Sequence, residues 1–186
     1  RANTMFKLTY QAFVLLSQAD KNSVPAERRL AAIHEIAQAA GIAGMVGGQT
    51  LDVLSEKSSP DLEVLQQIHR RKTGALLQAA VVSGAIISGA PLDKITALAD
   101  YGMNIGVAFQ IADDILNVEG DRKLMGKETG SDKALGKVTY PSLMGMDYAK
   151  QELQNHVDKA IICLAAFDKR ALPLRQIARY IMERKS

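Results

Sequence analysis

The stretch NIGVAFQIADDILNV, residues 104–118, decides the fold. If each residue turns the helix by about 100°, five of its small or polar residues share one arc of roughly 100°. These residues are Gly106, Gln110, Asp113, Asp114 and Asn117. The rest of the surface is Ile, Val, Ala, Phe and Leu, a composition expected inside a helical bundle. The stretch therefore predicts a largely buried helix with one polar stripe.

Helical spacing of apolar residues extends over most of the chain, without the alternation typical of strands. Pro25 and the Ser59–Asp61 triplet are typical of helix starts. We predict helices over about residues 5–18, 25–55, 61–88, 92–118, 141–167 and 173–184. The long polar stretch 119–140 is expected to be a loop. Residues 1–186 are thus predicted to form a single all-α domain.

The composition excludes several classes of protein. With 47% hydrophobic and 23% charged residues, the chain is not disordered by composition. Its single cysteine, Cys163, excludes an internal disulfide and a cysteine-based zinc cluster. A net charge of +3 and 5% aromatic residues argue against nucleic-acid binding. No run of about 20 uncharged apolar residues occurs, so no membrane span is predicted.

Asp113 and Asp114 are adjacent carboxylates on a mostly apolar helix. Removing such a pair from water is unfavourable unless a cation meets it. Two interpretations remain open: a solvated stripe on a surface helix, or a cation-binding site. Oxygen ligands would favour Mg²⁺ or another hard cation over zinc.

Lys72 lies in the middle of an apolar stripe on the predicted helix 61–88. A lysine in such a position either extends its ammonium group to water or meets an anion. Thr73 and Gly74 follow at once, and they supply a hydroxyl group and free space beside the ammonium group. The segment is a candidate anion-binding corner.

The segment GIAGMVGGQTLD, residues 41–52, places several glycines inside a predicted helix. Glycine inside a helix costs about 1 kcal/mol relative to alanine, so a packing reason is expected. We interpret Gly41, Gly44 and Gly47 as sites of close helix–helix approach. Gln49 and Asp52 share a face, either as a buried structural pair or as the lining of a polar pocket.

Two Gly-Lys pairs, at Lys127 and Lys137, lie in the polar stretch. Neither fits a Walker A loop, because the glycine spacing differs and the Ser or Thr after the lysine is missing. The two lysines are either solvated or reach phosphate oxygens from the loop.

Together these segments resemble the trans-prenyl diphosphate synthases. FQIADDILN (109–117), followed by the Gly-Lys pairs and GKVTYP (136–141), is similar to the second aspartate-rich region of that family. GIAGMVGGQTLD (41–52) and HRRKTG (69–74) resemble its GGQ-x-x-D and Lys-Thr motifs, in the same order. The similarity is greatest to bacterial short-chain enzymes that make farnesyl diphosphate, with geranylgeranyl diphosphate synthases next.

The resemblance implies an isoprenoid-synthase helical bundle with a central active-site cavity. It implies condensation of isopentenyl diphosphate with dimethylallyl or geranyl diphosphate to give farnesyl diphosphate. Mg²⁺, or alternatively Mn²⁺, would hold the allylic diphosphate and assist its departure. A cytoplasmic homodimer that binds no nucleic acid is also implied.

The same resemblance implies roles for individual residues. The metal would be held by Asp113, with Asp114 supporting it directly or through water. The diphosphate would be held by Lys72, Lys127 and Lys137. Oxygen dipoles of Thr73 and Gln110 would face the developing cation. The other substrate-binding residues would be Gln49, Asp52 and Phe109.

The chain departs from the family pattern in two places. Asn117 stands where a third aspartate is usual, and the first aspartate-rich motif is absent. We therefore expect residues 1–186 to be the C-terminal portion of a longer chain. A geranylgeranyl diphosphate synthase, a terpene cyclase on the same fold and a non-catalytic subunit of a heteromeric synthase remain alternatives.

The C-terminal segment is basic, with Arg175, Arg179, Arg184 and Lys185. These residues either complement the C-terminal end of a helix or, as the resemblance implies, belong to a tail that closes over the active site.

Overall fold

The structure of the chain, a computed structural model, describes residues 2–18, 24–55, 58, 60–125 and 138–184. The described residues contain helices and no strand, which confirms the predicted all-α class. The α-helices are α1 (Ala2–Ser17), α2 (Ala26–Ala40), α3 (Met45–Ser55), α4 (Leu62–His69), α5 (Ala75–Ser88), α6 (Leu92–Met125), α7 (Tyr140–Met144), α8 (Met146–Cys163) and α9 (Leu172–Glu183). A π-helical turn, η1 (Arg70–Gly74), joins α4 to α5, and a 3₁₀ turn, η2 (Lys169–Ala171), precedes α9.

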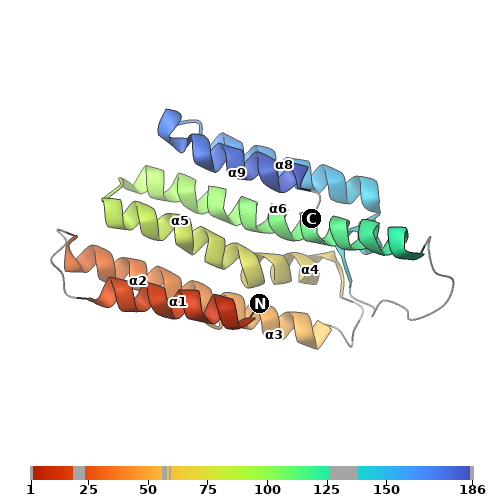
Figure 1. Cartoon of the computed structure of the whole chain (residues 1–186), viewed down its shortest axis with the longest axis horizontal. Helices are drawn as coiled ribbons and strands as arrows, with labels where there is room; N and C mark the ends of the chain where they lie inside the picture. The colour runs from red at the N-terminus through yellow and green to blue at the C-terminus, as the bar shows by residue number, and fades with distance from the viewer. Residues whose placement is uncertain (1, 19–23, 56–57, 59, 126–137, 185–186) are drawn as a thin grey trace.

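The helices are stacked in three layers along the long axis of the molecule (Figure 1). The first layer holds α1, α2 and α3, and the middle layer holds α5 and α6 with α4 at one end. The third layer holds α8 and α9. Helix α2 packs on α5, α5 on α6, and α6 on α8, so α6 lies between α5 and the third layer.

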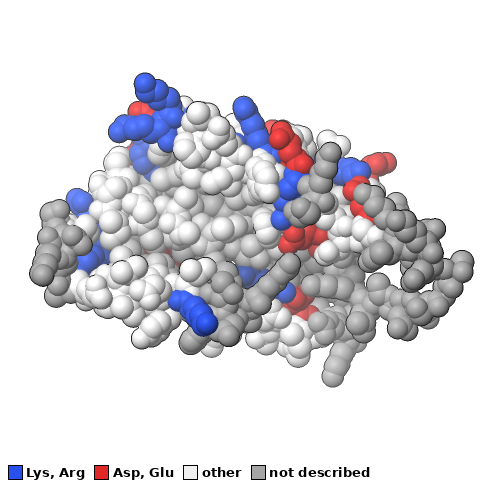
Figure 2. All heavy atoms as spheres, in the orientation of Figure 1, with Lys and Arg blue, Asp and Glu red and all other residues white. Residues whose placement is uncertain are grey.

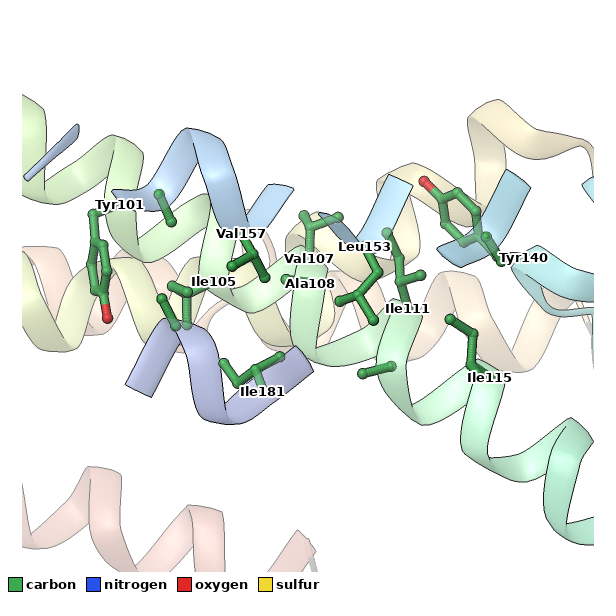
Figure 3. Close-up of a cluster of buried hydrophobic side chains, with 14 of the residues drawn as sticks. Tyr101, Ile105, Val107, Ala108, Ile111, Ile115, Tyr140, Leu153, Val157 and Ile181 are labelled. Atoms are coloured by element: carbon green, nitrogen blue, oxygen red, sulfur yellow. The ribbon is translucent and has the colours of Figure 1, made fainter. Parts of the chain in front are cut away.

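The main core lies along α6 (Figure 3). Ala108 and Ile111 of α6 are fully buried, and Val157 of α8 is 1% exposed. Leu153 and Val157 from α8 point toward α6 in the close-up view. Burying one such aliphatic side chain contributes about 1.5–3 kcal/mol, so this contact fixes the position of the helix that carries the aspartates.

Two predicted helices are divided in the structure. The prediction 25–55 is wrong at Gly41–Gly44, where a bend separates α2 from α3. The prediction 141–167 is divided at Gly145, whose φ of 87° lies in the region that favours glycine, and α8 ends at Cys163.

Helix α6 is longer than predicted, because it continues from 118 to Met125. The added residues contain one glycine and no proline, and the others are compatible with a helix despite their polarity. Residues 126–137, in the centre of the predicted loop, lie outside the described part of the chain.

The interpretation of Gly41, Gly44 and Gly47 as helix–helix contacts is also wrong. A Cβ atom on Gly44 would lie 2.0 Å from the carbonyl oxygen of Ala39, and one on Gly47 would lie 1.9 Å from that of Ile42. These glycines therefore permit a local bend, whereas the neighbouring Gly48 makes the close contact with another helix.

One helical stretch, Ala26–Ser55, is long and apolar enough to cross a membrane by length and composition alone. It comprises α2, the bend and α3. Because α2 packs on α5 and α3 packs on η1, this stretch belongs to the bundle described above. A single stretch of this kind is weak evidence for a span.

Candidate active site

The Lys-Thr segment lies on a π-helical turn, where a helix widens by one residue. In η1 the N–H of Ala75 donates to the carbonyl of Arg70, five residues back rather than four. Turns of this kind occur mostly as single bulges within α-helices and frequently at functional sites. The bulge contains Lys72 and Thr73, and both side chains are half-buried.

Glycines bring two neighbouring helices directly against this turn. A Cβ atom on Gly48 of α3 would lie 2.3 Å from the backbone nitrogen of Lys72. On the other side, a Cβ atom on Gly106 of α6 would lie 2.4 Å from the Cα of Gly74. Real Cβ atoms essentially never come that close to another atom, so only glycine fits at 48 and 106 without a backbone shift. The turn is therefore held between α3 and α6.

Lys72 pairs with Asp52 of α3, and their side chains are 26% and 12% exposed. Of the two alternatives for Lys72, contact with an anion is thus the correct one, and the anion is a carboxylate of the chain. The alternative of a buried Gln49–Asp52 pair is wrong, because Gln49 is exposed and Asp52 turns to the lysine.

Asp113 of α6 meets the C-terminal end of α9. Its Oδ1 accepts a hydrogen bond from Nη2 of Arg184, and its Oδ2 lies 3.5 Å from the amide nitrogen of Gln110. The Arg184 guanidinium lies over the Phe109 ring, with its carbon 4.1 Å from the ring centroid, and Nη2 also donates to the Phe109 carbonyl at 3.1 Å. The Asp113 side chain remains 36% exposed.

Asp114 faces a different set of groups, although it is the next residue. The residue is 7% exposed, and its Oδ2 accepts a hydrogen bond from the backbone N–H of Tyr140 at 3.1 Å. Nε2 of His69 lies 3.5 Å from the same oxygen, and the His69 ring stacks on Tyr140 with 5.5 Å between centroids. Burial raises the pKa of Tyr140, whose phenol therefore stays neutral beside this carboxylate. Asp114 thus joins α4, α6 and α7.

The structure decides between the two interpretations of the aspartate pair. A solvated stripe is wrong for Asp114, which is buried, and a cationic partner is present for Asp113. Asn117 is exposed. Within the described part of the chain, no group of three His, Cys, Asp or Glu residues is placed to hold a metal ion.

Asp113 nevertheless fits the role of a single ligand to a hard cation. It presents carboxylate oxygens, is accessible to solvent and already holds a positive charge, that of Arg184. Mg²⁺ typically takes one or two carboxylates and completes its shell with water and phosphate oxygens. These donors suit a Mg²⁺ ion that arrives with a diphosphate.

Acidic side chains lie mainly in the right-hand half of the face in Figure 2, toward the end where Figure 1 places α3 and α4, whereas basic side chains occur in both halves. Gly74 and Gly106 are in close contact. In the sequence, the Lys72–Asp52 pair comes before Gly74 and the Arg184–Asp113 pair comes after Gly106. Lys127 and Lys137, the other predicted diphosphate ligands, lie outside the described residues. Thr73, Gln49 and Phe109 keep their substrate roles as predictions.

A surface pocket of about 340 Å³ lies between α6, α8 and α9. Ile115, Leu153 and Ile181 contribute to its wall, and Arg184 lies at its edge. Lys72 and Asp113 do not line it, so the central active-site cavity stays a prediction.

Three residues of this site were not assigned their contacts from the sequence. His69 and Tyr140 lie within the quoted motifs HRRKTG and GKVTYP, but nothing in those motifs indicates contact with Asp114. Arg184 was assigned either to a helix end or to a tail that closes over the active site, and its partner Asp113 is 71 positions away in the chain.

Known proteins are similar to this chain in sequence and fold. The sequence pattern of the polyprenyl synthetase family matches residues 2–171. Dimethylallyltranstransferase of Fischerella ambigua is 44% identical over 162 residues, which are 87% of this chain and 47% of that protein. Farnesyl diphosphate synthase of Escherichia coli is 43% identical over 93% of this chain and 59% of its own.

Solved structures agree with this assignment. The apo crystal structure of an FPP/GFPP synthase from Zymomonas mobilis superposes with a TM-score of 0.80 at 38% identity, covering 92% of this chain and 57% of that one. A geranyltransferase from Helicobacter pylori, complexed with magnesium and isoprenyl diphosphate, gives 0.69 at 28% identity, covering 92% and 55%. The chain spans about half of the length of the curated relatives named above. Its sequence, its helical fold and the order of its motifs together show that it belongs to the polyprenyl synthetase family.

Proposed function

We propose that the protein containing this chain condenses isopentenyl diphosphate with dimethylallyl or geranyl diphosphate and releases farnesyl diphosphate. Relatives named farnesyl diphosphate synthase and dimethylallyltranstransferase support this reaction. The observation that carries the proposal is the charged arrangement around the π-helical turn. It combines an ammonium group on a constrained turn, Lys72, with an accessible carboxylate on the adjacent helix, Asp113.

Lys72 is positioned to hold a diphosphate. Its ammonium group is half-buried, and its helix is fixed by the close approaches at Gly48 and Gly106. In the absence of substrate, Asp52 supplies the negative charge that a diphosphate oxygen would supply later. A preorganised cation of this kind stabilises the charge that accumulates on the leaving diphosphate more than it stabilises the bound substrate.

Asp113, supported by Gln110, would hold Mg²⁺ at the other side of the diphosphate, and Mn²⁺ would serve in its place. The bound ion would neutralise charge on the diphosphate as its bond to the allylic carbon breaks. Asp114 is held by Tyr140 and His69, so we assign it the positioning of α6 rather than direct contact with the ion. The carbonyl of Gln110 and the hydroxyl of Thr73 would face the allylic cation.

The remaining expectations from the sequence belong to the same proposal. We propose a cytoplasmic homodimer that binds no nucleic acid. Exposed apolar residues on the first layer, such as Leu8, Tyr10 and Leu30, are available for contact with a second copy.

Geranylgeranyl diphosphate is the second candidate product. Geranylgeranyl diphosphate synthase of Cyanophora paradoxa is 40% identical over 94% of this chain, close to the identity of the farnesyl enzymes.

Incubation of the protein with labelled isopentenyl diphosphate, dimethylallyl diphosphate and Mg²⁺ tests the proposal. Chromatography of the product is expected to show a 15-carbon prenyl diphosphate, whereas a 20-carbon product would support the second candidate. Asp113→Asn is expected to lower the rate at least ~10²-fold, as loss of a transition-state contact does. Asp158→Asn, an exposed carboxylate on α8, is the matched control. A cyclic hydrocarbon, or no prenyl product, would contradict the proposal.

A further inference from the structure

Arg184 makes an unusual contact for the last described residue of the chain. Its side chain is only 9% exposed, although it follows α9 directly. It binds α6 three times: Nη2 donates to Asp113 and to the Phe109 carbonyl, and the guanidinium stacks on the Phe109 ring. Because α9 is itself held by Tyr101 and by the Arg175 contacts, the arginine is delivered to α6 by a fixed helix.

The contact engages the carboxylate that the proposed function assigns to Mg²⁺. Oδ1 of Asp113 is occupied by Arg184, and Oδ2 faces the Gln110 amide. A metal ion and a guanidinium group cannot share one carboxylate oxygen without strong repulsion between two cations at contact distance. Binding of a divalent ion to Oδ1 therefore requires the arginine to leave.

The arginine is not completely satisfied where it lies. Its Nε is buried and finds no acceptor among the described residues, which is unfavourable for a charged group. Arg184 also lines the pocket between α6, α8 and α9, together with Glu119 and its ion-pair partner Lys150. The displaced guanidinium thus has open space next to its present position.

We propose that Arg184 is a stand-in cation that occupies Asp113 until a divalent metal ion displaces it. The proposal rests on the proposed function, because it takes Asp113 as the metal ligand. Two states follow: in one, Arg184 neutralises Asp113 and ties the end of α9 to α6, and in the other the metal does so and the arginine is released. By linkage, whatever Arg184 contributes to this contact is subtracted from the affinity for the metal.

Titration with Mn²⁺ in the presence of inorganic diphosphate, followed by electron paramagnetic resonance of the free ion, measures the competition on this chain. Arg184→Gln is expected to bind Mn²⁺ about three- to tenfold more tightly than the unmodified chain, a change of ~0.6–1.4 kcal/mol. Arg184→Lys keeps the charge without the planar stacking and is expected to lie between the two. Arg179→Gln, an exposed arginine on the same helix, removes the same charge and is expected to stay within about twofold.

The variants separate failure of this proposal from failure of the proposed function. If Asp113→Asn abolishes Mn²⁺ binding while Arg184→Gln leaves it unchanged or weaker, the stand-in role is overturned and the metal site stands. If Asp113→Asn binds Mn²⁺ like the unmodified chain, or if no variant binds it up to millimolar concentrations, the metal site itself fails.

Modification by phenylglyoxal gives a second readout that does not depend on affinity. Arg184 is expected to react slowly without metal, because it is 9% exposed, and several-fold faster when Mn²⁺ is present. Exposed Arg179 serves as the internal reference in peptide mass spectrometry. Equal reactivity of Arg184 with and without bound Mn²⁺ would contradict the displacement.

Discussion

The two sides of α6 are packed in opposite ways. On the side toward η1 and α5, Gly106 and Gly102 allow the backbones to approach closely. A Cβ atom on Gly106 would lie 2.4 Å from the Cα of Gly74, and one on Gly102 would lie 2.6 Å from the Cα of Gln78. On the side toward α8, branched side chains such as Val107 and Val157 fill the space (Figure 3). Glycines allow close backbone contact on the side of α6 that faces the candidate site. On the side that faces α8, large apolar side chains provide the burial that stabilises the fold. The same helix thus fixes a geometry on one side and supplies burial on the other.

Gly106→Ala is expected to have the largest effect on stability. The added methyl group would meet backbone atoms of Gly74, which cannot move aside as a flexible side chain can. We expect a loss of about 2–4 kcal/mol in the free energy of unfolding, measured by urea denaturation with circular dichroism.

Gly84→Ala is the matched control for that substitution. A Cβ atom on Gly84 of α5 would meet nothing within 4 Å. Alanine has the higher helix propensity, so we expect a gain of about 0.5–1 kcal/mol. Equal losses at positions 84 and 106 would show that close backbone approach does not limit substitution on this side of α6.

Asp114→Ala and Asp113→Ala sharpen the comparison between the two sides. Asp114→Ala leaves the buried N–H of Tyr140 without its acceptor, so a loss of about 2–3 kcal/mol is expected. Asp113 is 36% exposed, and its partner Arg184 borders open space, so Asp113→Ala should cost about 1 kcal/mol or less. Urea denaturation of both variants measures the difference, and a larger loss for Asp113→Ala would reverse the assigned roles.

The sequence predicted the helical fold and placed both aspartates in one polar stripe of α6. It could not predict that the two aspartates contact different helices. Adjacent residues point about 100° apart on a helix, so one polar stripe can face two neighbouring elements. Asp113 turns toward α9 and Asp114 toward α4 and α7. That division depends on contacts with Arg184 and His69, which are distant in the sequence.

The π-helical turn at Lys72 was also beyond prediction from sequence. RRKTG has no proline, and its single glycine is compatible with an ordinary helix. The extra residue in this turn is favoured by packing against Gly48 and Gly106, whereas periodicity alone continues the helix. The signal that could have found it is the glycine pair of the GGQ segment, whose second member, Gly48, is the one in contact with η1.

Tyr101→Phe tests the contact between α6 and α9. The Tyr101 hydroxyl donates to the carbonyl of Leu174 at 2.7 Å, and burial raises the pKa of this phenol to about 12. Removing the hydroxyl leaves that carbonyl without this donor, and we expect a loss of about 1 kcal/mol in urea denaturation. Because the contact helps to position α9, the reactivity of Arg184 toward phenylglyoxal should rise as well. An unchanged reactivity would show that Arg184 is held without this anchor.

Substitution of His156 is expected to have the smallest effect of these variants, and it should change only how the free energy of unfolding depends on pH. It lies on α8, and its Nδ1 is 2.8 Å from the side-chain oxygen of Asn104 on α6, which places the proton on Nδ1 of the neutral ring. Burial lowers the pKa of His156, and the nearby charges of Lys159 and Arg70 lower it further, opposed by Glu152.

The unfolded chain therefore binds this proton more readily than the folded one, and stability falls as the pH drops below the usual histidine pKa of about 6.5. Above that value the contribution is fully present. His156→Gln is expected to reduce this loss of stability, measured as the change in urea midpoint between pH 7.5 and 5.5. His34→Gln, at an exposed histidine on α2, should leave it unchanged. An equal dependence on pH in all three proteins would mean that the interface between α6 and α8 accommodates a charged imidazole, and its packing would then be less tight than the buried valine and leucine side chains indicate.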